Sequence, residues 1–211
     1  MTDALRQRSR LCACLTMVFV SGCFYTTAGT KLAPITPPLP DYKPSVEQTV
    51  GDFSFTLEGG KMVTSNYAGR LLNDGILGAW KERGYIREAH YVENAAFSGA
   101  ADYNITLSGT QYGASSIGLQ LLSGLTLFLV PYTVTQSYDI QYTLVDVKTG
   151  KKYSASVQES NETYFELFLL FTLPVAQRGQ RQMMERMGDH LYEQLHRQGA
   201  FQRPADRPAA P

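Results

Sequence analysis

Hydrophobic and polar residues alternate along several segments of the chain, as they do in strands that bury one face. The clearest case is YDIQYTLVDVKTGKKYSASV, where Tyr138–Val147 and Tyr153–Gln158 flank the turn residues Lys148-Thr149-Gly150. This pattern predicts an antiparallel hairpin. Three further segments are strand candidates: Asp52–Leu57, Tyr85–Val92 and Asp102–Thr110.

Two other segments place apolar residues on one face at a helical period of about 3.6. They are Val63–Arg83, with a stripe through Leu72 and Ile76, and Gln177–Gln198, with a stripe through Met187 and Leu191. Gly84 and Gly199 follow them as helix stops. The order of elements predicts an α+β domain over residues 51–200, with a mainly antiparallel sheet and helices packed on one face.

Two apolar inserts, residues 115–136 and 162–176, interrupt this order. The directions of the predicted strands bring both inserts to the same end of the sheet. Monomers rarely leave such a large apolar patch in water, so we expect this end to contact a membrane or a partner. The expected contact residues are Leu121, Leu125, Leu127, Phe128, Phe165, Phe168, Leu169 and Phe171.

Neither insert resembles a membrane-spanning helix, since the first contains Gln120 and Pro131 and the second carries Glu166. The dipeptide Ser123-Gly124 predicts a turn between two short leucine-rich arms, so the first insert is expected to form a hairpin. The alternative is that one insert is a core helix that covers the sheet.

The first residues of the chain have the order of an export signal, with three arginines before the apolar segment Leu11–Val20. The next residues, Val20-Ser21-Gly22-Cys23, resemble the lipobox of bacterial lipoproteins. This resemblance implies that residues 1–22 are removed and that Cys23 carries acyl chains. It also implies that Cys12 and Cys14 are lost with the signal. The alternative is a buried N-terminal strand with a small-residue turn.

Phe24 rather than aspartate follows Cys23, which by the sorting rule of enterobacteria-like lipoproteins implies the periplasmic face of the outer membrane. Residues 23–50 contain five prolines between Pro34 and Pro44, and this density predicts a semi-rigid tether behind the anchor. A proline-rich ligand for a partner groove is the alternative. Residues 201–211 read as a disordered tail.

Charge and composition exclude several functions. The 19 basic residues balance the 19 acidic ones, which argues against a nucleic-acid partner. His190 and His196 are six positions apart on the predicted helix and do not share a face, so no metal site is expected. The sequence contains no phosphate-binding, dinucleotide-binding or nucleophile motif. We therefore expect no cofactor and no enzymatic activity.

The segments ADYNITLSGTQYG and YDIQYTLVDVKTGKKYSASV resemble outer-membrane lipoproteins of the curli-secretion type. Relatives of that type include exopolysaccharide-export lipoproteins and lipoprotein activators of peptidoglycan synthases. The matching residues are Asp102, Tyr103, Ile105 or Leu107, Gly109, Val145, Asp146, Thr149 and Gly150. The resemblance implies the same small α+β fold. A secretion pore is not expected, because the inserts here are shorter and lack the polar face of a pore lining.

These observations predict a non-catalytic outer-membrane lipoprotein that serves as an accessory or assembly factor of an envelope complex. Its partners would be the membrane, through the N-terminal lipid, and a second copy or another envelope protein. The alternative is a periplasmic lipid- or polymer-binding module that holds an acyl chain between the two inserts.

Overall fold

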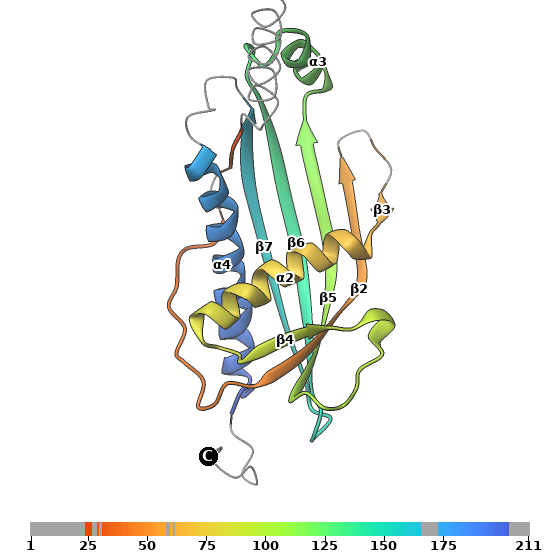
Figure 1. The fold of residues 1–211 in the computed structure, drawn as a ribbon, viewed down its shortest axis with the longest axis vertical. Coiled ribbons are helices and arrows are strands. Elements are labelled where there is room, and N and C mark those ends of the chain that lie inside the picture. Colours follow the sequence, from red (N-terminus) through yellow and green to blue (C-terminus); the bar gives the residue numbers. More distant parts are fainter. Residues whose placement is uncertain are drawn as a thin grey trace, which may run out of the picture.

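The computed structural model describes residues 24–26, 29, 31–57, 60, 62–165 and 173–202. Within these ranges seven strands form one sheet in the order β1-β7-β6-β5-β2-β3, with β4 paired to β2 (Figure 1). The strands are β1 (Phe24–Thr26), β2 (Ser45–Leu57), β3 (Val63–Thr64), β4 (Glu88–Tyr91), β5 (Tyr103–Ser115), β6 (Tyr132–Asp146) and β7 (Lys152–Phe165). The helices are α2 (Asn66–Arg83), the 3₁₀ turn η1 (Glu93–Ala95), α3 (Ile117–Leu125) and α4 (Leu173–Arg197).

Strands β5, β6 and β7 are long, and β6 runs antiparallel to its neighbours β5 and β7, while β2 runs parallel to both β5 and β4. Helices α2 and α4 pack over the same face of this sheet (Figure 1). The predicted α+β class, with helices on one face, is confirmed. The parallel pairings of β2 were not predicted from the sequence.

Trp80 is the centre of the core between the helices and the sheet, and it is fully buried. Its ring contacts Tyr142, Tyr192 and Phe201 edge-on, with centroids 5.8 to 5.9 Å apart. Its indole N–H donates to the Gly188 carbonyl at 2.8 Å, which ties α2 to α4. A single hydrogen-bonded aromatic cluster therefore holds both helices against β6.

The residues that carry the family resemblance shape the backbone. The Asp102 carboxylate accepts hydrogen bonds from the Ser45 N–H at 2.7 Å and its hydroxyl at 3.1 Å, which fixes the start of β2. The Asp146 carboxylate accepts the N–H groups of Lys148 and Thr149, each at 2.9 Å, and so closes the β6–β7 turn. At Gly109, with φ +152°, a Cβ would lie 2.2 Å from the Asp139 carbonyl. These roles are structural.

The expected proline-rich tether differs from the structure in two ways. Strand β2 begins at Ser45 rather than Asp52, and its residues Ser45–Val50 are buried between β4 and β5. Residues 31–44, here called the strap, run beside α4 from about the middle of β7 to the end of the sheet opposite α3 (Figure 1). They are docked on the domain instead of standing free.

Polar contacts explain why the strap is held. The fully buried Glu159 carboxylate accepts the N–H groups of Lys31 at 2.8 Å and Leu32 at 3.1 Å. His190 on α4 lies 2.9 Å from the Ala33 carbonyl. At the far end, the Arg87 N–H donates to the Pro44 carbonyl at 2.8 Å. The sequence pattern could not reveal these partners, because they come from distant parts of the chain.

Candidate functional site

The first apolar insert contains a helix where the Ser123-Gly124 turn and hairpin were expected, so that prediction is wrong. Ser116 caps the start of α3 by accepting the Leu119 N–H. At the other end the Thr126 hydroxyl donates to the Leu122 carbonyl at 2.8 Å. Leucine has a high helix propensity, and with both ends capped the helix is preferred over two very short strands.

Helix α3 has an inverted burial pattern: it exposes its leucines and buries a serine. Its one buried side chain is that of Ser123, at 0% exposure, and the Ser123 hydroxyl has no hydrogen-bond partner. Leu121 and Leu125 are 65% and 85% exposed. A helix of a water-soluble domain normally turns its apolar face toward the core. For the first insert the alternative of a core helix is therefore not what the structure has: α3 lies beyond the end of the sheet and does not cover it (Figure 1). Residues 166–172 of the second insert lie outside the described residues.

The chain leaves α3 through two residues in the left-handed region, Leu127 at φ +51° and Phe128 at φ +63°. The Phe128 N–H donates to the Ser123 carbonyl at 2.7 Å, and the Leu127 N–H donates to Gly124 at 3.2 Å. This is the Schellman end of a helix, where glycine is usual at the position that Leu127 occupies. A strained leucine that is 75% exposed gives the fold no packing in return.

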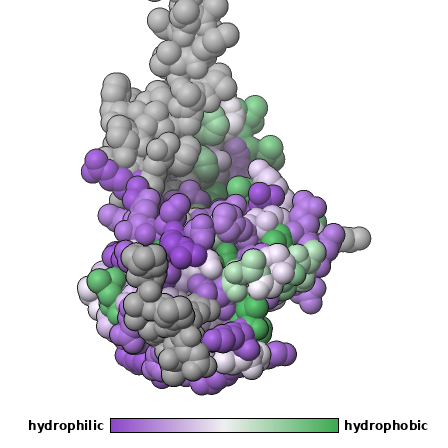
Figure 2. Space-filling model, turned by 60° about the horizontal axis from the view of Figure 1, so that its bottom comes forward, coloured by the Kyte–Doolittle hydropathy of each residue, from purple (hydrophilic) through white to green (hydrophobic). Residues whose placement is uncertain are grey.

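We call the exposed side chains at this end the apical apolar surface. Its members lie on α3 or in the following loop, and Figure 2 shows hydrophobic atoms gathered at the α3 end beyond a band of hydrophilic ones. They are Ile117, Leu119, Leu121, Leu122, Leu125, Leu127, Phe128 and Leu129. Four of the eight, Leu121, Leu125, Leu127 and Phe128, were expected from the sequence. The others belong to the same apolar run, and only their exposure in the structure distinguishes them from core residues.

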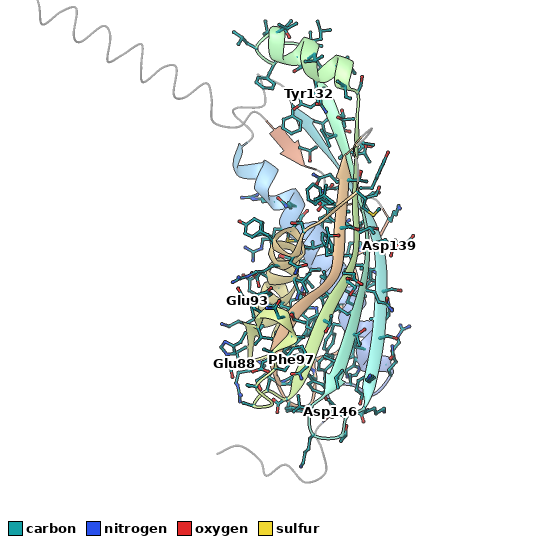
Figure 3. All side chains as sticks on the ribbon, turned by 90° about the vertical axis from the view of Figure 1, so that its right-hand side faces the viewer. Glu88, Glu93, Phe97, Tyr132, Asp139 and Asp146 are labelled. Carbon is teal, nitrogen blue, oxygen red and sulfur yellow. The ribbon has the colours of Figure 1, made fainter. Side chains whose placement is uncertain are left out.

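The end of β7 lies beside the apical apolar surface. Phe165 stacks on Tyr132, the first residue of β6, with ring centroids 4.6 Å apart and planes 5° from parallel. Burial raises the pKa of Tyr132 above its usual value. Figure 3 places Tyr132 next to α3, with Asp146 at the opposite end of the strand. The other expected contact residues, Phe168, Leu169 and Phe171, lie outside the described residues, as does Cys23.

The N-terminal strand also reaches this end. Strand β1 pairs antiparallel with β7, and its first residue, Phe24, is opposite Phe165. The residue that directly follows Cys23 therefore lies at the same end of the sheet as α3. The sequence pattern alone did not indicate this position of Phe24.

Helices α2 and α4 bury a charged side chain, Asp189, between them. Asp189 accepts the Tyr85 hydroxyl at 3.1 Å and pairs with the Arg83 guanidinium at 3.0 Å. Burial raises the pKa of the Asp189 carboxyl above its usual value, against the lowering effects of Arg83 and Tyr85. An open groove of about 710 Å³ runs along these helices and is lined in part by Gly78 and Met184. It does not lie between the two inserts, where the acyl-chain alternative would need a pocket.

The described part of the chain lacks two features that would indicate other functions. No group of three or more His, Cys, Asp and Glu side chains there is placed to hold a metal ion. No helix within the described ranges is both long enough and apolar enough to cross a membrane.

No protein-family model and no curated protein matches the chain. Among solved structures, a PelC dodecamer from Paraburkholderia phytofirmans aligns over 80% of this chain and 96% of its own, with 14% identity and a TM-score of 0.35. A lipoprotein from Neisseria meningitidis aligns over 64% and 96%, with 16% identity and a TM-score of 0.29. Similarity this low carries no argument about function, so the functional argument depends on the residues of this chain.

Proposed function

We propose that this chain is an acyl-anchored lipoprotein of the bacterial outer membrane, facing the periplasm, and that it serves an envelope complex as a non-catalytic accessory or assembly factor. Cys23 carries the acyl chains, and the apical apolar surface makes the functional contact. The signal peptide and lipobox of the sequence support the anchor. The exposed apolar end of the structure supports the contact.

The inverted burial of α3 is the observation that carries this proposal. Covering a leucine side chain contributes about 1.5–3 kcal/mol, so covering four of these leucines would contribute on the order of 6 kcal/mol or more. An isolated domain that faced only water would forgo that stabilisation and would risk aggregation. An apolar partner, whether lipid or protein, gives these side chains a function.

The anchor and the apolar end have complementary roles in this proposal. A single acyl chain holds a protein to a membrane only marginally, while two or three hold it stably. The acyl chains would therefore fix the location of the protein, and the apical apolar surface would determine what the domain contacts there.

The test is made in the native host, with the wild type and Cys23→Ser compared side by side. Intact-protein mass spectrometry should show the wild type beginning at Cys23 with the added mass of acyl chains, in the outer-membrane fraction. Cys23→Ser should lose the acyl mass and leave that fraction. Crosslinking of the wild type should capture envelope proteins. Leu121→Asp should reduce that capture while the protein stays acylated, whether the apical apolar surface touches the captured protein or orients the domain on the membrane beside it. A wild type that retains residues before Cys23 and has a free thiol would overturn the proposal.

A further inference from the structure

We propose that the apical apolar surface docks into the same lipid leaflet that holds the acyl chains on Cys23. This inference rests on the proposed acylation and names the partner of the apolar end. The domain then stands with its α3 end on the membrane and its β6–β7 turn, at Asp146, directed away from it.

The register of β1 is the first step of the argument. Phe24 pairs with Phe165, and Phe165 stacks on Tyr132, from which the chain leads directly to α3. Consecutive Cα atoms are about 3.8 Å apart, so an anchor on the residue before Phe24 starts at this end of the sheet. Acyl chains that enter a leaflet from there bring the apical apolar surface to the same leaflet.

The strap is the second step, because it removes the slack that a free tether would provide. Glu159 holds Lys31 and Leu32 near the middle of β7. Gly29 passes so close to this carboxylate that a Cβ on Gly29 would lie 2.6 Å from Glu159 Oε2. A free proline-rich tether could separate the domain from the membrane by several nanometres. With the strap docked, the distance between anchor and domain is short.

The charge-free stretch that contains the apical apolar surface favours lipid over a protein partner. Residues 103–138, which include β5, α3 and the upper half of β6, contain no Asp, Glu, Lys, Arg or His. The first charge on β6, Asp139, is seven residues from Tyr132, or about 23 Å along the strand. On the described part of β7 the nearest charge is Glu162, three residues before Phe165, where its carboxylate accepts the Tyr164 hydroxyl. Protein interfaces usually use charged groups at their rim to fix orientation, whereas a hydrocarbon surface excludes them.

Polar aromatic side chains mark where the membrane surface would lie. Tyr132 and Tyr164 occupy the ends of β6 and β7 just below the leucines of α3, and Tyr164 is partly exposed. Tyrosine is enriched at the boundary between hydrocarbon and headgroups. The nine residues of α3 reach only about 14 Å, so the helix enters the interface without crossing the bilayer.

The experiment uses acylated full-length protein, purified from membranes and reconstituted in phosphatidylethanolamine–phosphatidylglycerol vesicles. Because the Cys23 thiol is occupied by lipid, Leu125→Cys introduces a single site for an environment-sensitive fluorophore. Leu71→Cys, on an exposed position of α2 away from the apical end, is the matched control. Lipids with brominated acyl chains should quench the label at 125 several-fold more than the label at 71.

The outcomes separate this inference from the proposed function. Equal, weak quenching at both positions in protein of the correct acylated mass would overturn the docking and leave the lipoprotein assignment intact. Crosslinking of the 125 label to a second copy, with no quenching by lipid, would also overturn it. Absence of the acyl mass would overturn the proposed function itself. Leu127→Asn, which tolerates the left-handed backbone, should reduce quenching at 125 without loss of folding; unchanged quenching would count against docking.

Discussion

Gln194 on α4 pairs with the backbone of Ser156 on β7 in the way that a neighbouring strand would. The Ser156 N–H donates to the Gln194 side-chain oxygen at 3.1 Å, and the Gln194 amide donates back to the Ser156 carbonyl at 2.9 Å. One helical turn later, Gln198 repeats the exchange with Ser154, at 3.2 and 2.6 Å. The two side chains close an edge of the sheet that β1 is too short to cover.

Replacing both glutamines should therefore open this edge. We expect Gln194→Ala with Gln198→Ala to lower the free energy of unfolding by only about 1 kcal/mol, because water can take over exposed backbone groups. The larger effect should be self-association, since unpaired strand edges join one another. Light scattering after size exclusion should detect larger species than in wild type. Gln182→Ala, an exposed change on the same helix, is the control, and an unchanged size in the double variant would refute the role of the glutamines.

The two hydrogen bonds from the Lys31 and Leu32 N–H groups to Glu159, here called the Glu159 clasp, should be weakened by exchanging one carboxylate oxygen. Glu159→Gln replaces one acceptor oxygen by an NH₂ group that faces a backbone donor. Leaving a buried donor unsatisfied costs about 1–3 kcal/mol, so we expect a loss of that size in urea denaturation. Hydrogen exchange at the Lys31 and Leu32 amides should become faster. Glu193→Gln, which removes an exposed pair with Arg197, should change stability by less than about 0.5 kcal/mol. Equal effects of the two variants would show that the clasp is not specific.

Asp189 should give the protein a defined pH dependence. Its pKa is raised in the folded state, so the folded protein binds this proton more tightly than the unfolded chain. The contribution of Asp189 to stability is then fully present below its unfolded pKa and is lost as the pH rises through the folded value. The stability of wild type relative to Asp189→Asn should accordingly fall as the pH rises above about 4, the usual pKa of an aspartate. Denaturation curves for both proteins across this range measure the difference, and a constant difference would contradict the raised pKa.

Leu127 should be a position where stability and function oppose each other. Its left-handed backbone favours glycine, so we expect Leu127→Gly to raise the free energy of unfolding by about 1 kcal/mol. The same change within α3, Leu121→Gly, should lower it by about 1 kcal/mol, because glycine is a poor helix former. Thermal or urea denaturation of both variants compares the two signs. A destabilised Leu127→Gly would mean that the leucine packs in a way that its exposure does not indicate.

The sequence predicted what local periodicity determines and missed what distant partners determine. The alternation from Tyr138 to Leu144 follows from burying one face of a strand, and it located β6 correctly. The start of β2 at Ser45 was missed because the prolines before it are typical of a tether, while the Asp102 carboxylate that fixes it lies 57 positions away. The Glu159 clasp spans 128 positions and has no local pattern.

At the candidate site, the apolar composition was predictable and the conformation was not. Ser123-Gly124 is a common turn pair, so the helix depended on caps at Ser116 and Thr126 that outweighed it. The placement of β1 beside Phe165 was likewise not predictable, since three residues of a strand give no detectable alternation.

The parallel pairing of β2 with β5 sets the order in which the chain can fold. Val46 pairs with Tyr103, which is made much later in the chain. Strand β5 in turn pairs with β6, and β6 with β7, and both of these strands come later still. Such long-range pairing is slow to nucleate. A polypeptide that emerges N-terminus first through a narrow translocation channel would thus stay unfolded until most of its length has passed. The late closure of the sheet is compatible with the export across a membrane that the proposed function requires.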